Sequence, residues 1–185
     1  MNNEISLGTW LSLYSEAIAE VLVNAGYEWV TVDLEHSAIT IDQAEKLIRV
    51  IDLAGAKPYV RVSSNDAVQI KRVLDAGAQG IIVPMVNTKD DVLAAISAMN
   101  YPPLGSRGMG LARAQGYGQA NLKSKYIEKS SKELELYIQI ESKDALDNLD
   151  DIFSQNIDGY MIGPYDLSSS MGIPGDFKNQ DFLEV

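Results

Sequence analysis

The chain has 185 residues, of which 46% are hydrophobic, and 15 Lys and Arg against 26 Asp and Glu give it a net charge of −11. This acidity argues against nucleic acid or an anionic membrane surface as a partner, since both repel a negatively charged protein. The sequence contains no cysteine, which excludes disulfides, thiolate nucleophiles and Cys-ligated metal centres. The length and the apolar content suit one globular domain over residues 1–185.

The amino-terminal segment is polar and acidic rather than a basic and apolar signal, and no apolar run in the sequence reaches the length of a membrane span. We therefore expect a cytoplasmic protein that partners neither membrane nor nucleic acid.

Short β-type apolar runs alternate along the chain with longer amphipathic stretches. The expected strands cover residues 5–13, 28–34, 57–62, 80–86, 134–140 and 159–163. The expected helices cover residues 16–24, 41–54, 67–76, 88–99, 122–131 and 143–153. A Gly- and Pro-containing loop over residues 101–118 is the one irregular region. This alternation predicts an α/β fold with parallel strands joined by right-handed helical crossovers.

The number of βα units bears on the type of sheet. Six expected units nearly fill the chain, whereas a complete eightfold barrel takes about 250 residues. The pattern alone leaves open a doubly wound sheet or a barrel, and a barrel would lack its last units.

In parallel α/β folds the catalytic groups gather at the carboxyl ends of the strands. The residues expected there are Trp10, Ser12, Glu35, His36, Arg61, Gln139, Glu141 and Asp166. The carboxylates of Glu141 and Asp166, together with water, suit a hard cation such as Mg²⁺ or Mn²⁺. The alternative is that each carboxylate caps the helical turn that follows it.

Arg61 lies between Val60 and Val62 in an expected central strand, so its guanidinium must face a polar cavity or be buried at high cost. Beside a divalent cation, such a group would stabilise an enolate oxygen. Further along the chain, the Gly163-Pro164-Tyr165 turn offers backbone N–H groups of Tyr165 and Asp166 as a cradle for a substrate carboxylate.

His36 is the only histidine in the sequence and follows a buried strand. A lone histidine is more often structural, but its grouping with Arg61, Glu141 and Asp166 at sister strand ends favours a role in acid/base chemistry. Asp75 ends the expected 67–76 helix, where an acid is unfavourable against the helix dipole. That position hints at a use beyond solvation, although the position alone slightly favours a solvated surface residue.

Several short motifs occur along the chain, namely Gly8-Thr-Trp-Leu11, Asp33-Leu-Glu-His36, Val60-Arg-Val62, Leu74-Asp-Ala-Gly-Ala78, Val83-Pro-Met-Val86, Tyr101-Pro-Pro103, Arg107-Gly108, Gln139-Ile-Glu141 and Gly163-Pro-Tyr-Asp-Leu-Ser168. Together they resemble the HpcH/HpaI aldolases, which are metal-dependent class II pyruvate aldolases. The similarity runs over nearly the whole chain, and the joint spacing of the motifs is far more specific than any one of them.

The resemblance implies a (β/α)₈ TIM barrel of the phosphoenolpyruvate/pyruvate type, of which this chain would hold about six units without the carboxyl-terminal ones. It also implies a homo-oligomer, a trimer or a hexamer. Glu141 and Asp166 would hold Mg²⁺ or Mn²⁺, with Co²⁺ as a further choice. Because Asp75 belongs at the amino-terminal rim, its implied pairing with His36 is expected between subunits.

The implied reaction is retro-aldol cleavage of a 4-hydroxy-2-oxo acid to pyruvate and an aldehyde, or its reverse. His36, Arg61 and Asp75 would be catalytic, and Trp10, Gln139, Gly163, Pro164 and Tyr165 would bind substrate. A Schiff-base aldolase is disfavoured, since no lysine falls at an expected strand end. A lyase acting on a malyl-type thioester and a non-catalytic oxo-acid-binding or assembly module remain alternatives.

Overall fold

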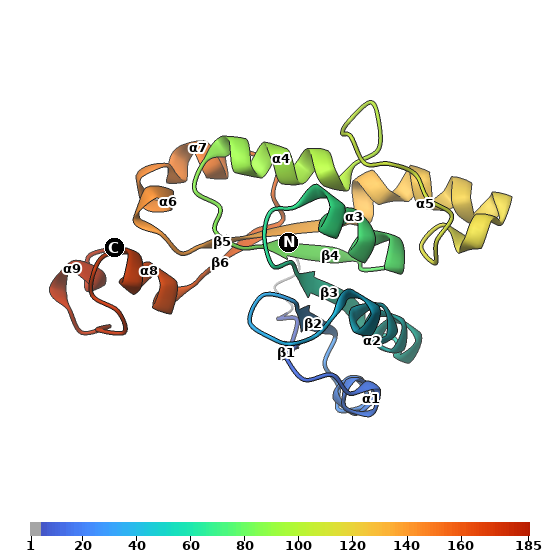
Figure 1. Cartoon of the computed structure of the whole chain (residues 1–185), viewed down its shortest axis with the longest axis horizontal. Helices are drawn as coiled ribbons and strands as arrows, with labels where there is room; N and C mark the ends of the chain where they lie inside the picture. Colours follow the sequence, from blue (N-terminus) through green and yellow to red (C-terminus); the bar gives the residue numbers. More distant parts are fainter. Residues whose placement is uncertain (1–4) are drawn as a thin grey trace.

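Six parallel strands form one sheet in the order β1-β2-β3-β4-β5-β6 in the computed structural model, which describes residues 5–185 (Figure 1). The strands are β1 Gly8–Leu11, β2 Trp29–Asp33, β3 Lys57–Arg61, β4 Gly80–Val83, β5 Glu135–Ile140 and β6 Gly159–Ile162. Each strand pairs with the next one along the chain. This consecutive order confirms the parallel α/β fold and excludes the reversal of strand order that defines a doubly wound sheet.

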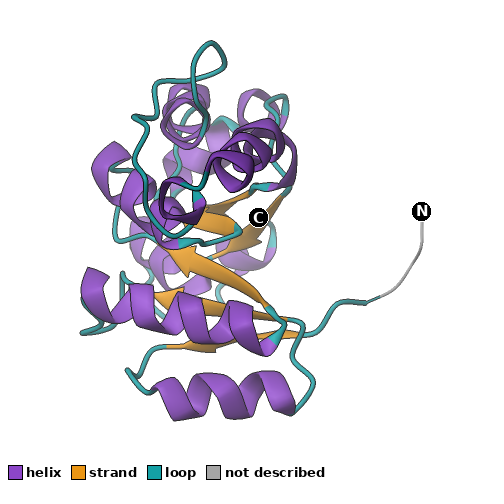
Figure 2. Cartoon of the chain, turned by 90° about the vertical axis from the view of Figure 1, so that its right-hand side faces the viewer, coloured by secondary structure: helices purple, strands orange, loops and turns teal. Residues whose placement is uncertain are grey.

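Helices connect the strands and pack around them (Figure 2). They are α1 Glu16–Asn24, α2 Ile41–Ala54, α3 Ala67–Ala76, α4 Lys89–Met99, the 3₁₀ turn Gly116–Gly118, α5 Ala120–Glu133, α6 Lys143–Asp147, α7 Leu149–Phe153, α8 Pro164–Ser170 and α9 Gln180–Leu183. Thr40 begins α2 with a capping box, and Gly55 ends it in the left-handed conformation. No helix within residues 5–185 is long and apolar enough to cross a bilayer.

Several element bounds differ from the sequence-based expectation. β1 covers Gly8–Leu11 rather than residues 5–13. β4 ends at Val83 because Pro84 follows and Met85 takes a left-handed φ of 52°. The expected 143–153 helix is divided at Asn148, whose side chain donates hydrogen bonds to the carbonyls of Asn87 and Asp144. These side-chain hydrogen bonds hold the backbone at Asn148, and the pattern of apolar residues along the sequence does not reveal them.

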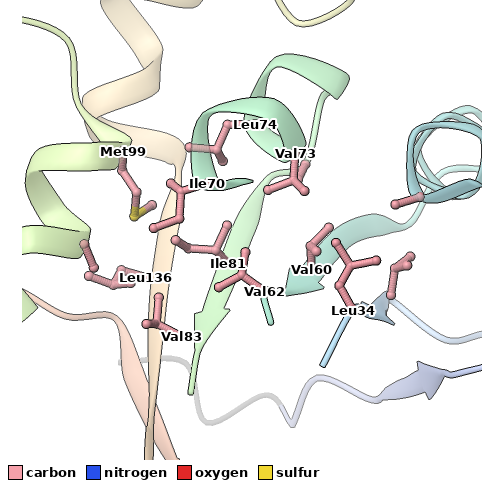
Figure 3. Packing of buried hydrophobic residues seen from close by; sticks show 14 of the residues in the cluster. Leu34, Val60, Val62, Ile70, Val73, Leu74, Ile81, Val83, Met99 and Leu136 are labelled. Carbon is pink, nitrogen blue, oxygen red and sulfur yellow. The ribbon is translucent and has the colours of Figure 1, made fainter. Parts of the chain in front are cut away.

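The core lies between the sheet and the helices on its outer side. Figure 3 shows Ile81 of β4 beside Ile70 of α3, and Val83 of β4 and Val73 and Leu74 of α3 belong to the same core cluster. All five side chains are fully buried. Alternate residues of β2, β3, β4 and β5 supply this apolar face, as the twofold repeat of a strand requires.

The opposite face of the sheet carries larger and more polar side chains. Near its amino-terminal end, Glu135 Oε2 accepts hydrogen bonds of 2.6 Å from the hydroxyls of both Tyr59 and Tyr137. Lys57 donates a 2.5 Å hydrogen bond to Glu135 Oε1. Within residues 5–185, β1 pairs only with β2 and β6 only with β5, so the sheet is an open half-barrel.

Candidate active site

A cleft of about 470 Å³ lies at the carboxyl ends of the strands. Its lining residues are Trp10, His36, Arg61, Gln139, Met161, Ile162, Gly163, Pro164, Tyr165 and Asp166. Most of the site residues expected from sequence therefore meet in one cleft, although they come from strands far apart in the chain. The reason is geometric, since every strand of a parallel sheet delivers its following residues to the same edge.

Arg61, the last residue of β3, is the most highly bonded side chain of the cleft. Its Nε and Nη2 atoms donate to Asp33 at 2.8 and 2.7 Å, and Nη1 donates to Gln139 Oε1 at 3.3 Å. The guanidinium carbon also lies 4.7 Å from the ring centroid of Trp10. The guanidinium is thereby held in one plane and at one orientation.

Asp33 is a site residue that sequence reasoning missed. Burial alone would raise the pKa of its carboxyl, but hydrogen bonds from Arg61 and from the Glu35 amide hold that pKa below its usual range. The signal for this pair was available in principle, because Asp33 and Arg61 end neighbouring strands. Only the register, which places Asp33 opposite Arg61, shows that they meet.

Glu35 lies behind the cleft, between Arg61 and His36. Its Oε2 atom is 3.2 Å from Arg61 Nη1 and 3.9 Å from His36 Nε2, yet this buried oxygen accepts no hydrogen bond. The contact between Glu35 and Arg61 is therefore an ion pair without a hydrogen bond. Burial raises the pKa of Glu35 against the opposing effect of Arg61. The His36 side chain is 62% exposed, so it is open to a ligand in the cleft.

Glu141, directly after β5, is almost fully buried beside the cleft. Its Oε1 atom accepts a 2.7 Å hydrogen bond from the Met85 backbone, and Oε2 accepts from the side-chain amide of Gln139. A Cβ added at Gly163 would lie 2.4 Å from Glu141 Oε2. A glycine at position 163 is therefore required for β6 to pass this close to the carboxylate.

The donor chemistry of the site fits a hard cation. Asp166 lines the cleft, and Glu141 lies on the neighbouring chain segment with each of its oxygens accepting one hydrogen bond. Glu35 adds a buried oxygen that accepts no hydrogen bond. No group of three or more His, Cys, Asp or Glu side chains with metal-binding geometry occurs within residues 5–185. Two carboxylates would leave most coordination positions to water or substrate oxygens, as Mg²⁺ prefers.

Asp75 lies outside this cleft, at the end of α3. Its Oδ1 atom accepts hydrogen bonds from Arg107 Nη2 at 2.6 Å and from Gln115 Nε2 at 2.9 Å. Within residues 5–185, His36 forms an ion pair with Glu35, and Asp75 forms one with Arg107. No ion pair in this part of the chain joins Asp75 to His36. Within one chain, Asp75 therefore anchors the 101–118 loop to α3.

The chain matches the family model "HpcH/HpaI aldolase/citrate lyase" over residues 6–185. It is 39% identical to the 2-keto-3-deoxy-L-rhamnonate aldolase of Klebsiella pneumoniae, covering 100% of this chain and 69% of that protein. It is 40% identical to the hydroxypyruvate/pyruvate aldolase of Sagittula stellata, covering 91% of this chain and 66% of that protein.

Among solved structures, an HpcH/HpaI aldolase/citrate lyase family protein from Burkholderia cenocepacia superposes with a TM-score of 0.90 at 32% identity. The match covers 98% of this chain and 72% of that one. The chain thus spans about two thirds of the length of the relatives it matches. The named relatives are aldolases, which are carbon–carbon lyases, so the expected enzyme class is confirmed. The chain belongs to the HpcH/HpaI aldolase/citrate lyase family.

Proposed function

We propose that the protein is a metal-dependent, cytoplasmic aldolase that cleaves or forms the C3–C4 bond of a 4-hydroxy-2-oxo acid, giving pyruvate and an aldehyde. The observation that carries this proposal is the single cleft lined by Arg61, His36 and Asp166, with Glu141 beside it. Enolate chemistry needs a positively charged side chain, a proton acceptor and a pair of carboxylates that can bind a metal ion. Arg61, His36 and the pair Glu141 and Asp166 would fill these three roles.

The six strands are proposed to be part of a (β/α)₈ barrel, in which further βα units pair with the free edges of β1 and β6. The consecutive parallel order supports this, as does the TM-score of 0.90 to a longer relative. Small-barrel interiors are filled by side chains, which suits the cluster of Tyr59, Tyr137 and Glu135 on the inner face.

Glu141 and Asp166 would hold the divalent cation, Mg²⁺, Mn²⁺ or Co²⁺, and a bound cation would supply Lewis-acid polarisation of the 2-oxo acid. Substrate binding is assigned to the remaining cleft residues, Trp10, Gln139, Gly163, Pro164 and Tyr165. The backbone amides that follow Pro164 lie in the first turn of α8, beside Asp166.

In the cleavage direction, the exposed imidazole of His36 accepts the proton of the 4-hydroxyl group. The C4–O bond then becomes a carbonyl as the C3–C4 bond breaks, and the electron pair of that bond moves into the C2–C3 enolate. A guanidinium has five N–H donors, and Asp33 and Gln139 take three of them. Arg61 therefore keeps N–H capacity for the enolate oxygen. Protonation at C3 completes pyruvate.

Asp75 is proposed to pair with the His36 of a neighbouring copy in a trimer or hexamer, where it would hold the imidazole in one tautomer. Asp75 is the partly exposed member of its pair with Arg107, with 17% of its side chain accessible. A structure of the assembled protein in which His36 and Asp75 of different copies are not within hydrogen-bonding distance would refute this pairing.

The test is pyruvate release from a 4-hydroxy-2-oxo acid by the purified protein, with and without EDTA. We expect activity that EDTA abolishes and that Mg²⁺ or Mn²⁺ restores. In parallel, His36→Ala should lower kcat strongly while Mn²⁺ affinity, followed by electron paramagnetic resonance, stays near that of the wild type. Weakened Mn²⁺ binding would instead make His36 a ligand. Inactivation by borohydride with pyruvate would refute the metal-dependent mechanism.

A further inference from the structure

Asp33 makes an unusually large number of contacts for one small side chain. It ends β2 opposite Arg61, which ends β3, and the residue is 4% exposed. Its two oxygens accept separate hydrogen bonds from Nε and Nη2 of Arg61, at 2.8 and 2.7 Å. This bidentate arrangement fixes the plane of the guanidinium as well as its position.

The same carboxylate also holds the turn that carries His36. Asp33 Oδ1 accepts the backbone N–H of Glu35 at 3.0 Å and that of His36 at 3.3 Å. The Asp33 carbonyl accepts a hydrogen bond from the Ser37 hydroxyl. One residue therefore bonds both to the side chain of Arg61 and to the backbone from which the imidazole extends.

We infer that Asp33 is the positioning residue that sets Arg61 and His36 at a fixed separation across the cleft. The inference rests on the proposed function and adds a residue to it. In that reaction the proton leaves the 4-hydroxyl group while charge develops on the 2-oxo oxygen, so the two groups must meet one substrate at the same time. A displacement of about 1 Å between reacting groups can cost about 100-fold in rate.

Two substitutions separate these contacts. Asp33→Asn keeps Oδ1, which can still accept from the turn amides and from Arg61 Nε, but it places an N–H donor against the Nη2 donors of Arg61. Asp33→Ala removes the contacts to Arg61 and to the turn together. A residue that merely filled space would tolerate Asn, because Asn and Asp have nearly the same size and shape.

The experiment measures NMR signals and turnover on the same purified variants. His36 is the only histidine, so its ring signals are unambiguous. In Asp33→Asn, we expect the Arg61 Nε–H signal to shift, the His36 ring signals to stay, and kcat for pyruvate release to fall about 10- to 100-fold. Asp33→Ala should move both signals. Asp42→Asn, an exposed acid paired with Lys46, is the control and should change none of them.

An Arg61 Nε–H signal and a kcat that are both unchanged in Asp33→Asn would overturn the inference. If Asp33→Asn fails to fold, Asp33→Glu is measured in its place, because it keeps a carboxylate but moves it by one methylene group relative to Arg61 and the turn. An Arg61 Nε–H signal and a kcat that are both unchanged in Asp33→Glu would then overturn the inference. A wild-type protein that releases no pyruvate would refute the proposed function rather than this inference. The two failures can be told apart because the NMR signals are measured without substrate.

Discussion

Replacing Asp75 with Ala should destabilise the protein by about 3–5 kcal/mol, because it leaves a buried guanidinium without its anionic partner. The Arg107 side chain is 0% exposed, and its Nη2 atom lies 2.6 Å from Asp75 Oδ1. Burial alone would lower the pKa of Arg107, but Tyr126 and Asp75 keep that pKa above its usual value. The group therefore stays charged inside the protein and depends on Asp75 for compensation.

The magnitude follows from what remains after the substitution. Arg107 would keep a 2.9 Å hydrogen bond to the Tyr126 hydroxyl and its position 4.9 Å from the ring centroid of Tyr101. Neither partner is an anion, and Arg107 Nε is already buried without a hydrogen bond. The Gln115 amide would also lose one of its two acceptors, keeping the Tyr101 hydroxyl at 2.9 Å. These losses place the cost at the level of a broken buried ion pair rather than of a surface one.

Urea unfolding followed by circular dichroism measures this change in the free energy of unfolding. For a chain of this size, 3–5 kcal/mol corresponds to a fall in melting temperature of about 6–20 °C. Asp75→Asn keeps an acceptor for Arg107 and should cost less than Asp75→Ala. The control is Asp42→Ala, which removes an exposed pair with Lys46 and should cost about 0.5 kcal/mol or less. A loss of under about 1 kcal/mol in Asp75→Ala would refute the reasoning, since even one buried hydrogen bond is worth that much.

Two further predictions concern single residues. Met85→Gly should raise the free energy of unfolding by about 1 kcal/mol, because glycine adopts the left-handed φ of 52° without strain. The backbone N–H that donates to Glu141 is kept in this variant. A lower free energy of unfolding in chemical denaturation would contradict the prediction. Burial alone would raise the pKa of Glu135, but hydrogen bonds from Lys57, Tyr137 and Tyr59 hold it below its usual value. That stabilisation is present above the ordinary glutamate pKa of about 4.3 and is lost as the pH falls through the lower folded-state value. Unfolding titrations from about pH 6 to pH 3 should therefore show a steeper loss for wild type than for Glu135→Gln, and parallel curves would rule out the linkage.

The sequence by itself determined the six strands, the helices that join them and the edge of the sheet at which polar groups gather, whereas α8 was expected only as a turn and α9 was not expected. Short apolar runs predicted the six strands, and longer amphipathic stretches predicted the helices between them. These features depend on neighbours in the chain, so local rules find them. The same reasoning placed His36, Arg61 and Asp166 at strand ends, and the structure brings them to one cleft.

The partners of those residues were decided only by tertiary structure. Asp33 meets Arg61, Met85 meets Glu141, and Asp75 meets Arg107, across separations of 28, 56 and 32 residues. Such pairs depend on strand register, on one left-handed backbone angle and on the path of a long loop. None of these leaves a periodic pattern in the sequence, because each is fixed by packing between segments that are distant along the chain.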